Sequence, residues 1–377
     1  MAFLAGDGMG ESGGTGGIWR AIDASANRAG EALRVLEDVL RFGLDDHHLT
    51  RVAKDLRHDL AAVLARDGLD RRIAARDVAG DVGAGMEPEA GLARGDVTGL
   101  ITANAARGQQ ALRSLQECAA VVAPGTVAGF EAIRYRLYAL ERSAAAAARS
   151  RHRLAGVELC VLVDGGPDEA AFARLVSGLV GAGVRMLQIR DKGLPVPTLL
   201  ARVRRAHAIC REIDAADRPL VVVNDRADVA AAAAADGVHV GAADLPVVAA
   251  RRVLGPGPLV GRTAHDLTEA RAAVDDAADY LGIGPCFPSS TKAFAAHARP
   301  EFLREVCSTV SLPVFAIGGV TLARLEPLVA LGVRRVAVAS AVTGAADPSR
   351  AARELLDELR RLTSLPAQER PRATATT

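Results

Sequence analysis

The sequence predicts an α/β protein in which a C-terminal (β/α)₈ barrel (a TIM barrel) is preceded by an all-helical domain. The first indication is length, because 377 residues are enough for two domains. The second is a change of pattern: apolar residues recur at helical spacing up to about residue 150, whereas short apolar runs alternate with helical segments from about residue 158. The third is that eight near-equal strand-and-helix units favour a closed barrel over a doubly wound open sheet.

These patterns divide the chain into four segments. We expect a disordered Gly-rich tail over residues 1–17, the helical domain over residues 18–150, the barrel over residues 156–362 and a disordered tail over residues 363–377. The first tail has few side chains to bury, and the second is polar and rich in Pro and Thr. Such segments cannot offset the entropy of folding by burial.

An internal repeat divides the helical domain. Arg28, Arg34 and Glu37-Asp38 recur as Arg107, Arg113 and Gln116-Glu117, and Leu56-Arg57 recurs as Ile133-Arg134. Each copy has the pattern of one helix followed by another, so we expect two helical hairpins packed together. The segment between them, residues 71–85, mixes charge with glycine and is either a connecting loop or a cradle for a ligand.

The barrel strands are short and rich in Val, Ile, Leu and Ala, as expected of parallel strands that are covered on both faces. We place them at residues 159–163, 185–189, 220–223, 237–240, 259–261, 280–284, 314–317 and 335–339. In such a barrel the active site is built where the strands end, so polar residues at these ends are the candidates.

Composition excludes several classes of function. Lys plus Arg (46) and Asp plus Glu (45) nearly cancel, and aromatic residues make up 3% of the chain, so we expect no binding to nucleic acid or to an anionic membrane. No stretch approaches the roughly 20 apolar residues of a membrane span, and the N-terminus lacks the pattern of a signal peptide. The five scattered cysteines suit reduced thiols in a cytoplasmic protein.

The second strand ends in side chains that suit an anion. Side chains alternate along a strand, so Gln188 and Arg190 point toward the barrel mouth if Leu187 and Ile189 pack against helices. Lys192 follows them. The alternative is that these residues cap a neighbouring helix, but burying an arginine without a partner would be costly.

Two aspartates suggest a metal ion. Asn224-Asp225 follows the third strand, and Asp244 lies in the loop after the fourth. Carboxylates beside cations and phosphate-binding groups fit Mg²⁺, which is held by one or two carboxylates and keeps several waters. A cap on the next helix is the alternative role for Asp244. After the fifth strand, the Thr263 hydroxyl could orient a polar ring, whereas we expect His265 to be structural.

Small and hydroxyl-bearing residues follow the last three strands. They are Ser289, Thr291 and Lys292 after the sixth, Gly318 and Gly319 after the seventh, and Ser340 after the eighth. The loop at residues 284–292 could be a simple turn with an exposed lysine, but the glycines and Ser340 suit the phosphate site that is common in such barrels. A diphosphate held by the cations and Mg²⁺ beside a monophosphate suggests group transfer with diphosphate leaving.

Over residues 158–359 these motifs, in this order, resemble the thiamine phosphate synthase family. The matching segments are residues 183–192, 222–226, 237–246, 284–292 and 316–320. The resemblance implies a transferase of thiamine biosynthesis. It would join hydroxymethylpyrimidine diphosphate to thiazole phosphate through a pyrimidine carbocation, with Mg²⁺ as cofactor and thiamine phosphate and diphosphate as products.

The resemblance also implies a role for each residue. Asp225 and Asp244 would ligate Mg²⁺. The diphosphate would be held by Arg190, Lys192, Asn224 and Lys292, the pyrimidine by Gln188 and Thr263, and the thiazole phosphate by Ser289, Thr291, Gly318, Gly319 and Ser340. Of these, Arg190, Lys192, Lys292 and Thr263 would take part directly in catalysis.

Four positions depart from the family pattern, and one of them is Cys160, which replaces a usual tyrosine. Thr263 stands where serine is usual, and Ser289 stands where threonine is usual, so both keep a hydroxyl. Arg324 replaces an asparagine that is common after the Gly-Gly motif, and we expect it to alter the loop without binding a ligand.

The helical domain resembles a domain that is fused to such synthases in some bacteria. The match rests on residues 23–38, 56–57, 76–83 and 134–141. It implies a hydroxymethylpyrimidine phosphate kinase that uses ATP, although no Walker loop is present. The candidate residues are Asn27, Arg28, Arg34, Glu37, Asp77 and Asp81. The alternative is a scaffold or dimerisation unit whose arginines pair with its own carboxylates.

Two other functions are open to the barrel. A related isomerase that acts on the thiazole phosphate, a tautomerase-like enzyme, would not need a diphosphate site. A non-catalytic ligand sensor would not need metal carboxylates. The charged strand ends therefore favour the synthase, with small molecules as partners, and a homo-oligomer is compatible with the sequence.

Overall fold

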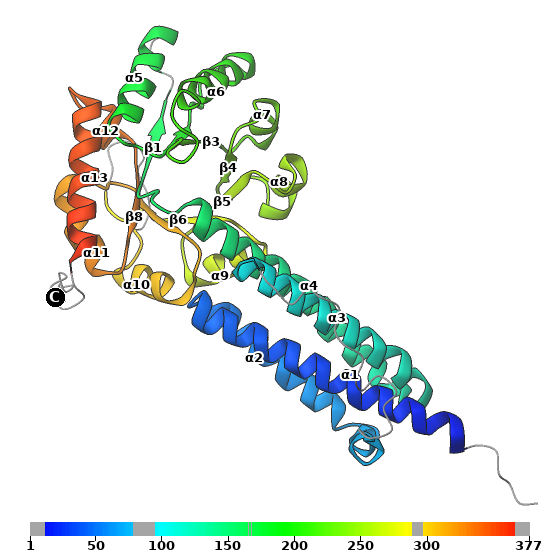
Figure 1. Ribbon diagram of the computed structural model, residues 1–377. Helices are drawn as coiled ribbons and strands as arrows, with labels where there is room; N and C mark the ends of the chain where they lie inside the picture. Colours follow the sequence, from blue (N-terminus) through cyan, green and yellow to red (C-terminus); the bar gives the residue numbers. More distant parts are fainter. Residues whose placement is uncertain (1–11, 78–94, 165, 167, 289–296, 366–377) are drawn as a thin grey trace, which may run out of the picture. The chain divides into compact units, whose positions relative to one another are not determined.

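The computed structural model describes residues 12–77, 95–164, 166, 168–288 and 297–365 (Figure 1). The chain divides into two compact units, Met1–Ala145 and Ala146–Thr377. A search of the described helices finds none that is long and apolar enough to cross a membrane.

The N-terminal unit consists of the two predicted helical hairpins. The first joins α1 (Ser12–Asp38) to α2 (His47–Leu64) through the π-helical turn η1 (Val39–Gly43), and the 3-10 helix η2 (Leu69–Ala75) follows. The second joins α3 (Val97–Val122) to α4 (Val127–Arg153) through η3 (Pro124–Thr126). α1 also packs along α3, and this contact brings the two copies of the repeat together.

The sequence repeat is also a structural repeat. In the first copy, Arg57 donates from Nε to Glu37 at 2.9 Å, and in the second, Arg134 donates from Nε to Gln116 at 2.7 Å. Glu37 and Gln116 are both buried. The same contact, which we call the hairpin clasp, therefore ties together the two helices of each hairpin.

Helices extend into both segments that were expected to be tails. α1 begins at Ser12, so the prediction of disorder up to residue 17 was wrong for residues 12–17. The last helix, α13 (Pro348–Ser364), likewise continues past residue 362. Once a helix is nucleated, each added residue gains a hydrogen bond, and even a glycine-rich start can be included. The rest of both predicted tails lies outside the described residues.

The C-terminal unit is the predicted barrel. Its parallel strands pair in the order β1 to β8, and β8 pairs with β1, which closes the barrel and excludes an open sheet. The strands are β1 (Leu159–Val163), β2 (Met186–Ile189), β3 (Leu220–Asn224), β4 (Gly237–Val240), β5 (Leu259–Ala264), β6 (Tyr280–Ile283), β7 (Val314–Ile317) and β8 (Arg335–Val338). β5 is longer than predicted, so Thr263 lies within a strand, beside Gly282 of β6.

Helices surround the barrel (Figure 1). They are α5 (Glu169–Gly181), α6 (Val196–Cys210), α7 (Ala227–Ala232), α8 (Val247–Leu254), α9 (Leu267–Asp275), α10 (Pro300–Thr309), η4 (Leu322–Arg324), α11 (Leu325–Ala330), α12 (Ser340–Thr343) and α13. Asp168, Asp266 and Asp347 each accept a hydrogen bond from a backbone N–H near the start of a helix, which fixes where α5, α9 and α13 begin.

The barrel interior is filled by apolar side chains from the strands. Met186, Tyr280 and Phe315 belong to this core, and the rings of Tyr280 and Phe315 meet edge to face with centroids 5.5 Å apart. The Tyr280 ring takes the space beside Gly261, where a Cβ atom would lie 2.1 Å from the ring. The interior is therefore packed, and room for ligands is left at its ends.

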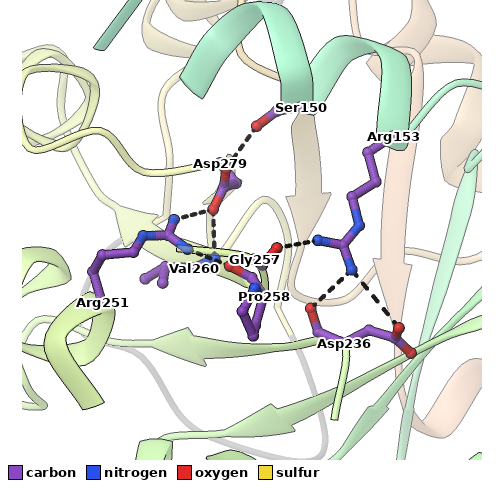
Figure 2. A network of polar contacts seen from close by, with 8 residues as sticks. All are labelled: Ser150, Arg153, Asp236, Arg251, Gly257, Pro258, Val260 and Asp279. Carbon is purple, nitrogen blue, oxygen red and sulfur yellow. Dashed lines mark hydrogen bonds and ion pairs between the residues drawn. The ribbon is translucent and has the colours of Figure 1, made fainter. Parts of the chain in front are cut away.

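A polar network lies where β5 and β6 begin, at the end of the barrel opposite the candidate site (Figure 2). Asp279, just before β6, accepts hydrogen bonds from Ser150 Oγ at 2.9 Å and Val260 N at 2.7 Å, and it pairs with Arg251. Every partner of this buried carboxylate is thus a donor or a cation.

A second carboxylate, Asp236, occupies the equivalent place before β4 (Figure 2). It accepts from Val221 N at 2.9 Å, and its other oxygen lies 3.7 Å from Arg153, which also donates to the carbonyl of Gly257. The last turn of α4 thereby covers the N-terminal ends of neighbouring strands within the C-terminal unit.

Candidate active site

The carboxyl end of β2 presents the predicted polar side chains. Gln188 is buried at 4% exposure within the strand, and Arg190, half-buried, continues the ladder by donating from its backbone N to Val163 O at 2.8 Å. Lys192 follows and is exposed. The three residues therefore follow one another at and just beyond the carboxyl end of β2.

Two carboxylates and a cation meet beside them. Lys192 Nζ lies 3.1 Å from Asp225 Oδ2, and the Asp244 carboxyl is within hydrogen-bonding reach of the Asp225 carboxyl. Burial raises the pKa of Asp225, Lys192 opposes the rise, and Asp244 adds to it. Two close carboxylates that are partly withdrawn from water favour a cation between them.

The Asp244 side chain bonds within its own loop and not to the following helix. Its Oδ2 accepts from Gly241 N at 2.7 Å, within the same loop, while the N-cap position of α8 is Pro246. Asp244 is therefore not the cap of the following helix. In the described ranges, no group of three or more His, Cys, Asp or Glu side chains is placed to hold a metal ion, so Asp225 and Asp244 form a two-carboxylate set.

Thr263 is held by a residue that sequence reasoning missed. His239 Nε2 lies 2.9 Å from Thr263 Oγ1. Burial, with a contribution from the nearby Arg262 cation, lowers the pKa of His239 to about 4, so the ring is neutral near pH 7. Asn224 is the register partner of His239 across β3 and β4. The histidine stood in a matched motif, residues 237–246, but no role was assigned to it.

A cavity of about 560 Å³ opens at the ends of β7 and β8. Gly318, Gly319 and Ser340, the described residues predicted to hold the thiazole phosphate, all line it. Arg190, predicted to hold the diphosphate, lines it as well. Gly319 has φ +62°, and a Cβ atom there would lie 2.4 Å from Pro288 O. Only glycine allows the backbone to approach this closely.

Arg324, which was expected to alter the loop, also lines the cavity. Its Nη1 donates to Gly319 O at 2.6 Å and to Pro288 O at 3.2 Å, and its guanidinium carbon lies 4.9 Å from the centroid of the Phe287 ring. Arg324 therefore joins the two loops that wall the cavity.

Other expectations concern residues near this site. His265 Nδ1 lies 2.7 Å from Gly284 O, in keeping with the structural role that was predicted. Burial raises the pKa of Cys286 to about 12, so its thiol is not a ready nucleophile. Ser289, Thr291 and Lys292 lie outside the described residues.

The helical unit has a larger cavity of its own, of about 780 Å³, between the first half of α1 and the second half of α3. Of the kinase candidates, Asn27, Arg28 and Asp77 line it. Glu37 instead serves the hairpin clasp, with Arg34 at 3.8 Å, and neither lines the cavity. Asp81 lies outside the described residues.

Known proteins match both units. The model of the thiamine monophosphate synthase family matches residues 159–342, and that of the ThiD2 family matches residues 20–143. The thiamine-phosphate synthase of Rhodopirellula baltica is 40% identical over 335 residues, which cover 86% of this chain and 88% of that protein. The thiamine-phosphate synthase of Synechococcus sp. strain WH7803 is 38% identical over 351 residues, which cover 91% and 96%.

A solved structure, thiamine phosphate pyrophosphorylase from Pyrococcus furiosus, is 31% identical and covers 54% of this chain and 96% of its own, with a TM-score of 0.49. The match to the two synthases extends through both units of the present chain. By its match to the two family models and to the two synthases, the chain belongs to the thiamine-phosphate synthase family, as a transferase with a barrel and an N-terminal ThiD2-family domain.

Proposed function

We propose that the barrel catalyses the Mg²⁺-dependent condensation of hydroxymethylpyrimidine diphosphate with thiazole phosphate, giving thiamine phosphate and diphosphate. The observation that supports this most strongly is the meeting of Asp225, Asp244 and Lys192 at the strand ends, with Arg190 two residues before Lys192 in the chain. This arrangement suits a diphosphate and its metal ion better than it suits a single phosphate.

The donor set fits Mg²⁺. Asp225 and Asp244 offer only carboxylate oxygens, the ligands that a hard cation prefers, and two protein ligands leave places for diphosphate oxygens and water. When bound, the ion would neutralise charge that develops on the departing diphosphate. Lys192 would move from Asp225 to the diphosphate, because its exposed ammonium is on a flexible stem.

The remaining described residues would position the two substrates. Arg190 borders the cavity at β7 and β8 and so would lie between diphosphate and thiazole phosphate. The backbone at Gly318 and Gly319, with Ser340, would take the thiazole phosphate. Gln188 and Thr263 would contact the pyrimidine, and Thr263 is oriented by a neutral His239.

The reaction itself needs no protein nucleophile. The bond between the pyrimidine methylene carbon and the diphosphate oxygen breaks, and both electrons leave with the diphosphate. The electron-rich aminopyrimidine bears the resulting carbocation until the thiazole nitrogen donates its lone pair to form the new C–N bond. Arg190 and Lys192 would stabilise the charge on the leaving group as it develops. The two alternative functions, isomerase and ligand sensor, would give the carboxylate pair Asp225 and Asp244 no role.

For the helical unit we propose the kinase activity that would supply the diphosphate. A phosphate oxygen of hydroxymethylpyrimidine monophosphate would attack the γ-phosphorus of ATP, and ADP would leave. Support comes from the ThiD2-family match and from the arginine-lined cavity in the same unit.

One experiment separates the two activities. Purified protein receives Mg²⁺ and thiazole phosphate, with either the pyrimidine monophosphate plus ATP or the pyrimidine diphosphate. We expect thiamine phosphate in both tubes. Product from the diphosphate alone would contradict the kinase proposal, and no product in either tube would contradict the synthase proposal for the barrel.

A further inference from the structure

We infer that the cavity between α1 and α3 binds a phosphomonoester, anchored by Arg28 and Asn27 of the first repeat copy. The inference rests on the proposed kinase function and goes further, because it locates the acceptor site and names the group that holds it. It also separates this site from the phosphate site in the barrel. The evidence is the charge balance of the cavity, the asymmetry of the repeat and the shape of the lining.

The charge balance leaves one cation available. Among the described residues, four arginines and three carboxylates line the cavity. Asp23, at 4% exposure, is held by Arg76 in a two-point contact, with Nε to Oδ2 at 2.7 Å and Nη2 to Oδ1 at 2.9 Å. Arg113 pairs with Glu117 along α3.

The third carboxylate is also matched. Arg20 Nη1 lies 3.7 Å from Asp77 Oδ2. Arg28 is exposed and forms no ion pair with any residue in the described part of the chain. Its planar guanidinium offers several parallel N–H donors, the geometry that a phosphate dianion accepts best. The described lining residues thus include one more cation than carboxylates, and Arg28 is the cation that has no ion pair among them.

The repeat indicates that the polar residues lining the cavity have a role beyond folding. Arg57 and Glu37 of the hairpin clasp have Arg134 and Gln116 as counterparts, so the clasp persists in both copies. At the cavity, five of the counterparts differ in kind. The positions that correspond to Arg20, Asp23, Asn27, Ser114 and Cys118 carry Gly99, Thr102, Ala106, Val35 and Val39.

A structural repeat would be expected to retain whatever the fold requires in both halves. Here the apolar core and the clasp are retained. Of the polar lining, Arg113 and Glu117 have like counterparts in Arg34 and Asp38, whereas Arg20, Asp23 and Asn27 of α1 have none. Arg28 itself has a counterpart, Arg107, which is also exposed but lies outside the cavity lining. Arg107 is therefore a matched control for Arg28, because it occupies the same position on a helix outside the cavity.

The rest of the lining suits a small aromatic ring with a phosphate. Gly17, Ala21 and Ala24 leave room, and Ser25 is buried at 3% exposure beside them. Burial and the neighbouring Glu117 raise the pKa of Cys118, so its thiol adds no negative charge. The volume falls in the range of about 300–1,000 Å³ that is typical of small-molecule sites.

The test measures binding without turnover. Hydroxymethylpyrimidine monophosphate is titrated by calorimetry into the full chain, without ATP, and into the Arg28→Gln and Arg107→Gln variants. We expect Arg28→Gln to weaken binding at least tenfold and Arg107→Gln to change it less than twofold, with equal melting temperatures for both. Asn27→Ala should weaken binding severalfold.

Equal binding by Arg28→Gln and the unmodified chain would overturn the inference, because the ligand would then lie elsewhere, including in the barrel. Equal loss in both variants, or no binding by the unmodified chain, would also overturn it. Phosphoryl transfer from ATP is measured in parallel. Arg28-dependent binding without transfer would retain the site and contradict the kinase, whereas unchanged transfer in Arg28→Gln would retain the kinase and contradict the site.

Discussion

At the scale of single residues, the barrel site depends on a few side chains that hold others in place. Asp225 and Asp244 share one location, His239 orients Thr263, and Arg324 joins two loops. Each residue acts through one or two contacts, so each can be tested by a single substitution.

Removing a carboxylate from the pair should abolish most of the synthase activity. Asp225→Asn keeps the shape of the side chain but loses the charge that a metal ion requires, so we expect kcat to fall by a factor of about 100 or more. The concentration of Mg²⁺ needed for half-maximal rate should rise as well. Asp228→Asn is the control, since Asp228 is exposed and pairs with Arg226. Equal activity of both variants would rule out the metal role.

Arg324 should matter for binding of the thiazole phosphate. Arg324→Ala removes charge-assisted bonds to Gly319 O and Pro288 O, and we expect KM for the thiazole phosphate to rise about tenfold with little change in KM for the pyrimidine diphosphate. Arg334→Ala serves as control, because Arg334 also donates to backbone carbonyls but does not line the cavity. A matching rise in both KM values would show a general structural effect instead.

His239 should make stability depend on pH. Its pKa is lowered to about 4 in the folded chain, below the ordinary value of 6.5, so the unfolded chain binds more protons between these values. The free energy of unfolding therefore falls as pH falls through this window, by about 2 kcal/mol between pH 8 and pH 5. Urea unfolding of the unmodified chain and of His239→Gln, at both pH values, measures the contribution of His239 to this pH dependence. An identical pH dependence in both proteins would contradict the assignment.

At the scale of elements, the two ends of the barrel have different tasks. The carboxyl ends of the strands carry the candidate site, and the amino ends are tied by Asp279 and Asp236 (Figure 2). Residues 146–153 at the end of α4 take part in this network through Ser150 and Arg153. We therefore expect the network to stabilise the barrel without contacting the substrates.

Breaking this network should reduce stability without reducing turnover. Asp279→Ala leaves Arg251 and Val260 N without their carboxylate, and we expect a loss of about 3 kcal/mol in the free energy of unfolding. Synthase kcat, measured well below the melting temperature, should stay within twofold. Asp276→Ala, an exposed carboxylate at the end of α9, should do neither. A large fall in kcat in Asp279→Ala would place this network in catalysis.

At the scale of the whole molecule, strong periodic patterns made the architecture predictable. The eight strands were recognised because buried parallel strands are continuous apolar runs, and the rule that barrel sites lie at strand ends then brought Gln188, Arg190, Asp225 and Asp244 together. Closure of β8 on β1 followed from the number of units.

Contacts between distant segments were not predictable in the same way. Arg324 reaches the cavity only because the loops at Pro288 and Gly319 approach each other, and no local pattern encodes this. Glu37 was a kinase candidate by motif, but its partner Arg57 lies on the next helix and makes it part of the clasp. The start of α1 was predicted too late, because the glycines before residue 18 were taken to indicate disorder, whereas the helix continues through them from Ser12.

The central claim is tested most directly by following both products of the barrel reaction. Pyrimidine diphosphate and thiazole phosphate are mixed with the full chain, and thiamine phosphate and free diphosphate are measured with Mg²⁺ present or removed by a chelator. The account predicts equal amounts of the two products, formed only with Mg²⁺. Diphosphate release without thiamine phosphate, or full activity in the presence of the chelator, would contradict it.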